Sequence, residues 1–142
     1  MHPGEKLTFC LIEAIGNYGK QAVPVLTEKL LHAKGDFKYA IIVILSDISA
    51  KLDYNKSAQD YIPLYEFSSD LLPFCIEGLQ SSESGRIRAR MAWILGENKY
   101  TKAVPVLKDA LTDEYTICAK EGVLYPVRRN AKAALEKMGV TE

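Results

Sequence analysis

The sequence predicts an all-α protein, a right-handed α-solenoid (an α–α superhelix) of about three and a half helical repeats. The pentad Ala-Val-Pro-Val-Leu occurs twice, at Ala22–Leu26 and at Ala103–Leu107. Each copy follows an aliphatic-Gly pair, Ile15-Gly16 or Leu95-Gly96, by a few residues. Self-similarity of this kind is the signature of stacked supersecondary units, so it indicates the architecture before any single residue is considered.

Composition and charge set wide bounds on the protein. The 142 residues, 48% of them hydrophobic and 25% charged, suit one domain with a hydrophobic core. Eighteen basic and eighteen acidic residues cancel, so no overall charge favours nucleic acid or membrane. The longest aliphatic run, Ala40–Leu45, is too short to cross a bilayer, and the first residues lack the apolar region of a signal peptide. We therefore expect one cytoplasmic domain, residues 1–142.

Four segments align without gaps and predict the first helix of each repeat. They are Leu7–Gly16, Phe37–Ser46, Ile87–Gly96 and Val127–Glu136. Positions one, five, eight and nine are apolar in each, which makes one stripe on a helix. The predicted inward residues are Leu7, Leu11, Ala14, Ile15; Phe37, Ile41, Ile44, Leu45; Ile87, Met91, Ile94, Leu95; Val127, Ala131, Ala134 and Leu135. Small residues, Ala14, Ala92 and Ala134, allow a neighbouring helix to approach closely.

A second helix is predicted after three of the first helices. The segments are Gln21–Leu31, Asp70–Gln80 and Lys102–Thr112, and they carry Pro24, Pro73 and Pro105 at corresponding places. Proline is tolerated in the first turn of a helix, so each helix should begin just before it. The expected inward residues are Val23, Leu26, Leu30; Leu72, Cys75, Leu79; Val104, Leu107 and Leu111. The unpaired fourth helix, Val127–Met138, should cap the solenoid and expose Arg129, Lys132, Glu136 and Lys137.

One run resembles a known repeat family. Ile87-Arg88, Ala92, Leu95-Gly96, Ala103-Val104-Pro105, Leu107 and Leu111 resemble the short HEAT-like repeat of the phycobilisome-lyase type, and Val127-Arg128, Ala131 and Ala134-Leu135 repeat its first half. The resemblance implies the α-solenoid, and it implies that Arg88 and Arg128 bind carbonyls or an Asp in an adjacent turn. The first two repeats depart from the pattern, with Thr8 and Lys38 at the Arg position. The motif specifies architecture and says little about function.

Two inserts interrupt the period, at about residues 49–69 and 114–126. The first helices start at residues 7, 37, 87 and 127, so successive starts are 30, 50 and 40 residues apart. The inserts carry Tyr54, Tyr61 and Tyr65 in the first and Tyr115 and Tyr125 in the second. Loops on a rigid scaffold often bind partners, and Tyr suits interfaces. The alternative is that these aromatic residues fold back and cover the edges of the scaffold.

Charge is segregated along the chain. The fourth residue after each repeat proline is acidic, Glu28, Glu77 or Asp109, and equivalent positions of stacked repeats form a ladder. We expect this ladder to line a concave groove that accepts a basic partner, the alternative being an ordinary solvated face. A band with six basic residues follows, from Arg86 to Lys108.

Catalytic and metal-binding patterns are not found. His2 and His32 are far apart, no metal-ligand spacing occurs, and neither a phosphate-binding glycine loop nor a Gly-x-Ser-x-Gly elbow is present. The pair Asp113-Glu114 is interpreted as a turn. We expect no catalytic residue, metal, cofactor or small-molecule substrate. The three cysteines, Cys10, Cys75 and Cys118, are predicted to be buried free thiols.

These observations favour a non-enzymatic protein–protein interaction module. One form would be a small bacterial inhibitor or immunity protein that neutralises a toxin or enzyme through its concave face and aromatic inserts. The expected partner is another protein with a basic surface, not a membrane. One alternative is a nucleic-acid-binding protein on a scaffold like that of HEAT-like DNA glycosylases, and another is an accessory subunit of a bilin-lyase-type enzyme. The predicted partner-binding residues are Glu28, Glu77, Asp109, Tyr54, Tyr61, Tyr65, Tyr115 and Tyr125.

Overall fold

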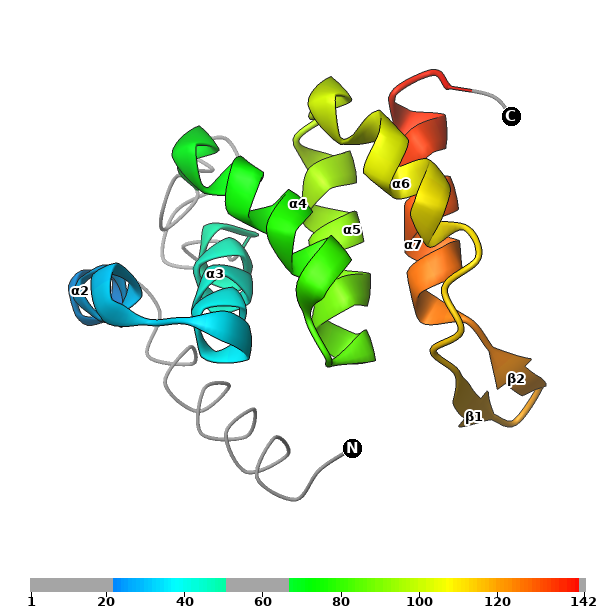
Figure 1. Ribbon diagram of the computed structural model, residues 1–142, viewed down its shortest axis with the longest axis horizontal. Helices are drawn as coiled ribbons and strands as arrows, with labels where there is room; N and C mark the ends of the chain where they lie inside the picture. Colours follow the sequence, from blue (N-terminus) through cyan, green and yellow to red (C-terminus); the bar gives the residue numbers. More distant parts are fainter. Residues whose placement is uncertain (1–21, 51–66, 141–142) are drawn as a thin grey trace, which may run out of the picture. The chain divides into compact units, whose positions relative to one another are not determined.

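The computed structural model describes residues 22–50 and 67–140, and these are mostly helical, as the sequence predicts. The chain divides after Leu71 into two compact units, residues 1–71 and 72–142, which are described separately (Figure 1). The predicted helix Leu7–Gly16 lies outside the described residues, and so do Cys10, Tyr54, Tyr61 and Tyr65.

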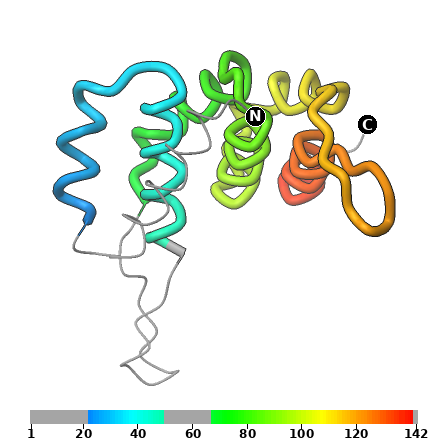
Figure 2. Tube along the Cα trace, turned by 90° about the horizontal axis from the view of Figure 1, so that it is seen from below, coloured from blue at the N-terminus to red at the C-terminus, as the bar shows by residue number. Residues whose placement is uncertain are grey.

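The first unit contains a helix pair. It consists of α2 (Val23–His32) and α3 (Gly35–Ala50), with a short 3-10 turn, η3 (Ser69–Leu71), at its end. The two helices pack against each other as an antiparallel pair joined by a short turn (Figure 2). Ala33 is extended and Gly35 has a φ of 61°, a left-handed conformation that glycine adopts without strain. The turn therefore follows from local chemistry at the end of α2.

Burial in α3 extends beyond the predicted stripe. Ile41, Ile44 and Leu45 are buried as predicted, but so is every residue from Tyr39 to Leu45. A helix that is apolar all round is typical of a position covered on several sides. Phe37 is the exception, because 46% of it is exposed, so its predicted inward position is wrong. It lies in the first turn of α3, beside the turn from α2, where the helix pair does not cover it.

The second unit is built around α5. Its helices are α4 (Leu72–Ser81), α5 (Gly85–Glu97), α6 (Val104–Ala110) and α7 (Pro126–Lys137), with the 3-10 turn η4 (Thr101–Ala103) before α6. Helix α5 packs against α4 and α7, and α6 packs against α7. The predicted inward residues of α4, α5 and α7 are all buried, and in α6 Leu107 is buried while Val104 and Leu111 are half-buried. The periodicity therefore predicted this core correctly.

Proline sets the start of the second helices. Helix α2 begins one residue before Pro24, α4 one residue before Pro73 and α6 one residue before Pro105. A proline in the first turn lacks only an N–H that has no partner within the helix, and its fixed φ suits helix geometry. The predicted starts are confirmed.

Helices α5 and α7 lie in register with each other. A Cβ added to Gly96 would lie 2.6 Å from Cβ of Ala134, so the two backbones approach as closely as these small residues permit. Glu97 and Lys137, which occupy equivalent repeat positions, form an ion pair, and Nζ of Lys137 lies 4.5 Å from the centre of the Trp93 ring. The predicted role of Ala134 in close helix packing is confirmed.

The second insert forms a β-hairpin. Strands β1 (Ile117–Ala119) and β2 (Gly122–Leu124) pair antiparallel, with Cys118 opposite Val123, and Pro126 is already part of α7. The hairpin projects beside the start of α7 (Figure 1). Cys75 is buried as predicted, but Cys118 is exposed on β1, so that prediction is wrong. A two-stranded pair buries little of its own surface, which leaves the Cys118 side chain in contact with solvent.

Candidate partner-binding surface

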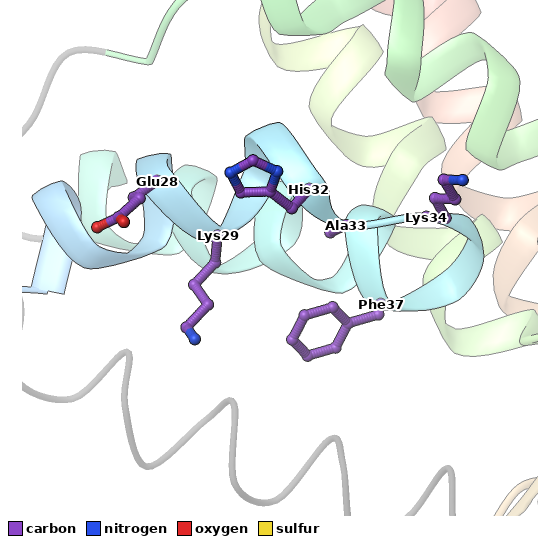
Figure 3. A pocket seen from close by; sticks show the side chains of 6 residues that line it. All are labelled: Glu28, Lys29, His32, Ala33, Lys34 and Phe37. Atoms are coloured by element: carbon purple, nitrogen blue, oxygen red, sulfur yellow. The ribbon is translucent and has the colours of Figure 1, made fainter.

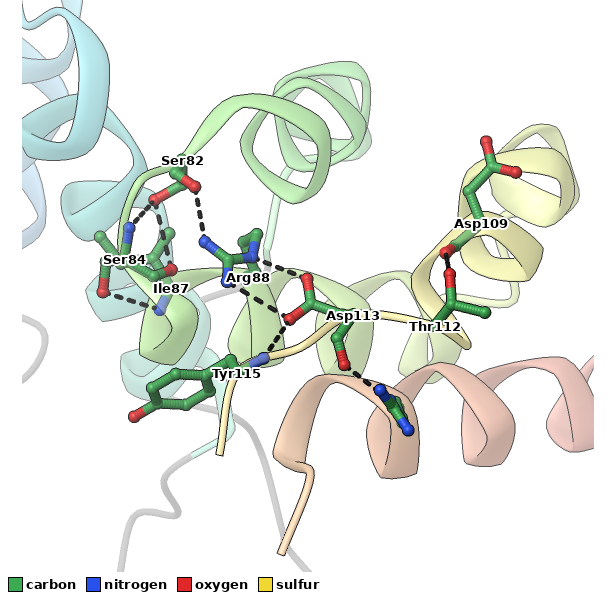
Figure 4. A network of polar contacts seen from close by, with 9 residues as sticks. Ser82, Ser84, Ile87, Arg88, Asp109, Thr112, Asp113 and Tyr115 are labelled. Carbon is green, nitrogen blue, oxygen red and sulfur yellow. Dashed lines mark hydrogen bonds and ion pairs between the residues drawn. The ribbon is translucent and has the colours of Figure 1, made fainter. Parts of the chain in front are cut away.

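A polar network joins α5 to the ends of α4 and α6 (Figure 4). Nε of Arg88 donates to Oδ2 of Asp113 at 2.8 Å, and Nη2 donates to Oδ1 at 3.3 Å. The third guanidinium nitrogen, Nη1, donates to the carbonyl of Ser82 at 2.8 Å. The carboxylate of Asp113 also accepts the N–H of Tyr115 at 2.9 Å. Because both charged side chains are mostly buried and form two hydrogen bonds with each other, the pair fixes the turn after α6.

Arg128 repeats part of this arrangement one repeat later. Its Nε donates to the carbonyl of Asp113 at 2.6 Å, and its guanidinium lies 4.0 Å from the centre of the Tyr125 ring. Arg88 and Arg128 thus each bind a carbonyl just beyond the end of the second helix that precedes them. Cations are favoured near the C-terminal end of a helix because the helix dipole is negative there. The structural role implied for both arginines is confirmed.

The Tyr115 side chain covers the N-terminal end of α5. Its ring occupies the space where a side chain at Gly85 would project, and the residue is half-buried. Ser84 caps the same helix end by accepting the N–H of Ile87 at 3.3 Å. Tyr115 therefore covers an edge of the scaffold, whereas Tyr125 is 40% exposed. A partner-binding role for either tyrosine stays a prediction.

Two members of the predicted acidic ladder lie at matching places in the second unit. Glu77 on α4 and Asp109 on α6 are both exposed, one turn after Pro73 and Pro105, which are exposed as well. These residues belong to the outward faces of α4 and α6, and these two helices are in contact. Asp109 makes no ion pair with another described residue. The register that the sequence predicted is therefore present on this face.

A shallow hollow of about 300 Å³ lies between α4 and α6. Its lining comes from both helices and from the turn after α6, and comprises Leu79, Gln80, Val106, Asp109, Ala110, Thr112 and Asp113. The hollow combines aliphatic side chains with two carboxylates, one of which is already paired with Arg88. A Lys or Arg side chain of a partner matches this combination, because its stem is apolar and its end is cationic.

The third member of the ladder has different surroundings. Glu28, in the first unit, lines a hollow of about 340 Å³ together with Lys29, His32, Ala33, Lys34 and Phe37 (Figure 3). One carboxylate faces two lysines there, so the local charge is not acidic. Phe37 and Lys29 project to the same side of the helix pair in Figure 3. Glu28 does not share the acidic environment of Asp109.

The basic band does not form one patch. Arg86, Arg88 and Arg90 lie in the first two turns of α5, whereas Lys99 and Lys102 follow its other end. At 1.5 Å per residue, Lys99 lies about 14 Å from Arg90 and about 20 Å from Arg86 along the helix axis. Arg88 is also held by Asp113. Lys108, the last residue of the band, lies on α6, so the band that motivated the nucleic-acid alternative is spread over both ends of α5 and over α6.

Two observations on the described residues concern nucleophilic and metal chemistry. Burial raises the pKa of the Cys75 thiol to about 12, so it is neutral at pH 7 and a poor nucleophile. No three His, Cys, Asp or Glu side chains in residues 22–50 and 67–140 lie close enough to hold a metal ion. Within the same part of the chain, no helix is long and apolar enough to span a membrane.

The comparisons with known proteins support the architecture. The family model of the PBS lyase HEAT-like repeat matches residues 87–113, which run from the start of α5 to the turn after α6. No curated protein and no solved structure matches the chain. The matched segment contains Arg88, the Gly96 contact and the Pro105 start described above, each with a structural role. The match therefore supports a HEAT-like repeat at residues 87–113, as the resemblance implied.

Proposed function

We propose that the chain is a non-enzymatic protein-interaction module whose α4–α6 face binds a basic segment of another protein. The HEAT-like repeat supports an interaction scaffold, because stacked helix pairs present extended surfaces. The observation that carries the proposal is the hollow between α4 and α6, where Asp109 lies beside aliphatic side chains. Complementary charge at such a site speeds association and selects among partners.

The proposal includes a right-handed solenoid of about three and a half repeats. It is supported by the equivalent positions of α5 and α7, which pack in register, and by the repeated Arg contacts with the ends of α4 and α6. A chain that stacks in this way has an extended scattering profile. Small-angle X-ray scattering of the full chain tests this, since a compact sphere of the same mass would contradict it.

Charge reversal in the hollow tests the binding role. Wild-type protein, Asp109→Lys and Glu136→Lys are immobilised, and retained proteins from the native host are quantified by mass spectrometry. Glu136 is exposed on α7 and takes the same charge change outside the hollow, so it is the matched control. We expect Asp109→Lys to retain at least about tenfold less of the partner, equivalent to about 1.4 kcal/mol. Equal retention by Asp109→Lys and wild type contradicts the proposal.

The affinity for the partner should also depend on the salt concentration. Binding through an exposed carboxylate weakens as ionic strength rises, because charges farther apart than about 8–10 Å are screened at physiological salt. The inhibitor or immunity role stays a prediction, since no feature of the described residues distinguishes it from another interaction role. Identification of the retained protein decides between them.

A further inference from the structure

The hairpin exposes apolar side chains on both of its strands. Ile117 is 39% and Val123 58% exposed, and Cys118 is exposed between them. Within the described residues, β1 pairs only with β2, over three residues. A two-stranded hairpin is marginally stable in water, and a third strand with an apolar face normally supports it. The hairpin therefore has the features of an incomplete sheet.

The free edge of β1 is more suited to pairing than that of β2. Strand β2 is followed by Tyr125 and by Pro126, which has no N–H and opens α7. Strand β1 is preceded by residues 114–116, which are neither helical nor prolines, so its edge can extend toward the N-terminus. Edge strands are usually protected by charges, prolines or bulges, and Ile117–Ala119 contains none of them.

We propose that β1 pairs antiparallel with β1 of a second copy of this chain, which joins two hairpins into a four-stranded sheet. The charges beside β1 favour this occupant. A two-fold axis at Ile117 places residues three positions before and after it opposite each other, so Glu114 meets the partner's Lys120. Both residues are exposed, and neither makes an ion pair with another described residue. Symmetry produces the complementary pair twice.

The same register also brings the exposed side chains of β1 into contact with the second copy. The two Ile117 side chains become direct cross-strand neighbours, and Cys118 lies opposite Thr116 of the other copy. An axis at Cys118 instead places Lys120 opposite Thr116 and Glu114 opposite Gly122, and both charge pairs are lost. The axis at Ile117 is therefore the one that matches charge and apolar contact together. This surface is separate from the α4–α6 hollow. A failure of the dimer proposal would therefore leave the proposed partner site untouched, and the reverse also holds.

Sedimentation equilibrium of the full chain tests the pairing. Small interfaces have dissociation constants in the micromolar to millimolar range, so the measurement covers about 10 µM to about 1 mM. We expect the average mass to rise from the 15.8 kDa of one chain toward twice that value. Ile117→Lys places two like charges opposite each other and should weaken the dimer at least about tenfold. Val123→Lys, on the outer strand, carries the same change and should leave it intact.

Charge exchange tests the register. Glu114→Lys and Lys120→Glu should each weaken the dimer, and the double variant should restore it. A mixture of the two single variants should form a heterodimer more tightly than either variant alone, because every pair is then of opposite sign. A chain that stays monomeric at all concentrations overturns the proposal and leaves the edge to a strand of another protein. A dimer that is insensitive to Ile117→Lys overturns it as well, and a double variant that is not rescued overturns the register.

Discussion

Helices α5 and α7 occupy equivalent positions of successive repeats, and their differences show what each position requires. Both bury residues one, five, eight and nine of the repeat. Helix α5 packs between α4 and α7, whereas α7 exposes Arg129, Lys132 and Glu136, as predicted for a cap. Lys137 is exposed too, but it reaches back to Glu97 of α5. The pattern that makes the core is shared by an interior helix and a terminal helix. Substitutions at equivalent positions can therefore separate the two environments.

The largest difference in stability is expected for the arginines at position two of the repeat, Arg88 and Arg128. Arg88 makes three hydrogen bonds from a largely buried position, two of them to Asp113, whereas one hydrogen bond is found for Arg128. Hydrogen bonds to charged groups contribute about 1.5–3 kcal/mol each at most, reduced here by partial exposure. We expect Arg88→Ala to lower the free energy of unfolding by about 2–3 kcal/mol and Arg128→Ala by about 1 kcal/mol. Urea denaturation of the full chain measures both.

A double-mutant cycle with Asp113→Ala separates the ion pair from the Ser82 contact. The coupling between Arg88 and Asp113 should be about 1–2 kcal/mol, within the range for groups in direct contact. Zero coupling would mean that the turn after α6 does not depend on the pair. Arg88→Lys should recover little, because an ammonium cannot make two parallel hydrogen bonds to the carboxylate while also reaching Ser82.

The next largest loss of stability is expected from a substitution at position ten of the repeat, where Gly96 of α5 lies close to α7. Gly96→Ala places a methyl group 2.6 Å from Cβ of Ala134 and forces the helices apart. Overpacking costs about 1–3 kcal/mol, and the better helix propensity of Ala returns about 1 kcal/mol, so we expect a net loss of about 1 kcal/mol. Glu136→Ala, at the equivalent exposed position, should stay within about 0.5 kcal/mol of wild type. Thermal unfolding of both variants provides the comparison, and a neutral Gly96→Ala contradicts the contact.

Substitutions at the helix ends should change the stability by about 1 kcal/mol or less, with opposite signs for the two helices. Both helices end in the same way: the N–H of Tyr100 binds the carbonyl of Leu95, and that of Val140 binds the carbonyl of Leu135. The left-handed residue is Lys99 (φ 47°) after α5 and Gly139 (φ 74°) after α7. Glycine adopts this conformation without the Cβ penalty.

Placing glycine at position 99 should therefore raise the stability, and placing lysine at position 139 should lower it. Lys99→Gly should stabilise the protein by about 0.5–1 kcal/mol, and Gly139→Lys should destabilise it by about 1 kcal/mol. Denaturant midpoints at constant m-value detect both shifts. Lys99→Ala serves as the control, because it removes the charged side chain but keeps Cβ. If Lys99→Gly and Lys99→Ala behave alike, the backbone conformation is not the cause.

Local patterns predicted most of the helical framework. The spacing of apolar residues identified α3, α5 and α7, because burial on a helix repeats every three or four residues. Pro73 and Pro105 placed the starts of α4 and α6 to within a residue, because the physical constraint acts on the proline itself. Glu77 and Asp109 were identified from the same register and do lie exposed on α4 and α6.

Features that depend on distant contacts were not predicted. Cys118 was predicted to be a buried thiol, and the hairpin that exposes it has no strong turn dipeptide to reveal it. Asp113 was identified as a turn residue. Its contacts with Arg88 and Arg128, which lie 25 and 15 residues away in the sequence, were not predicted, and neither was its hydrogen bond with the N–H of Tyr115. No local periodicity encodes which of several arginines reaches one carboxylate.

The sequence by itself determined the helix periods, the proline starts and the repeated register, because these depend on residues within one or two helical turns. Tertiary structure decided the environments of equivalent residues. It made Gly96 a contact point and left Glu136 in solvent, it paired Arg88 with Asp113, and it placed Asp109 beside an aliphatic hollow while Glu28 lies among lysines. The physical reason is that packing and charge pairing depend on which side chains of other segments lie nearby. These neighbouring side chains differ between equivalent positions in the middle and at the end of a stack.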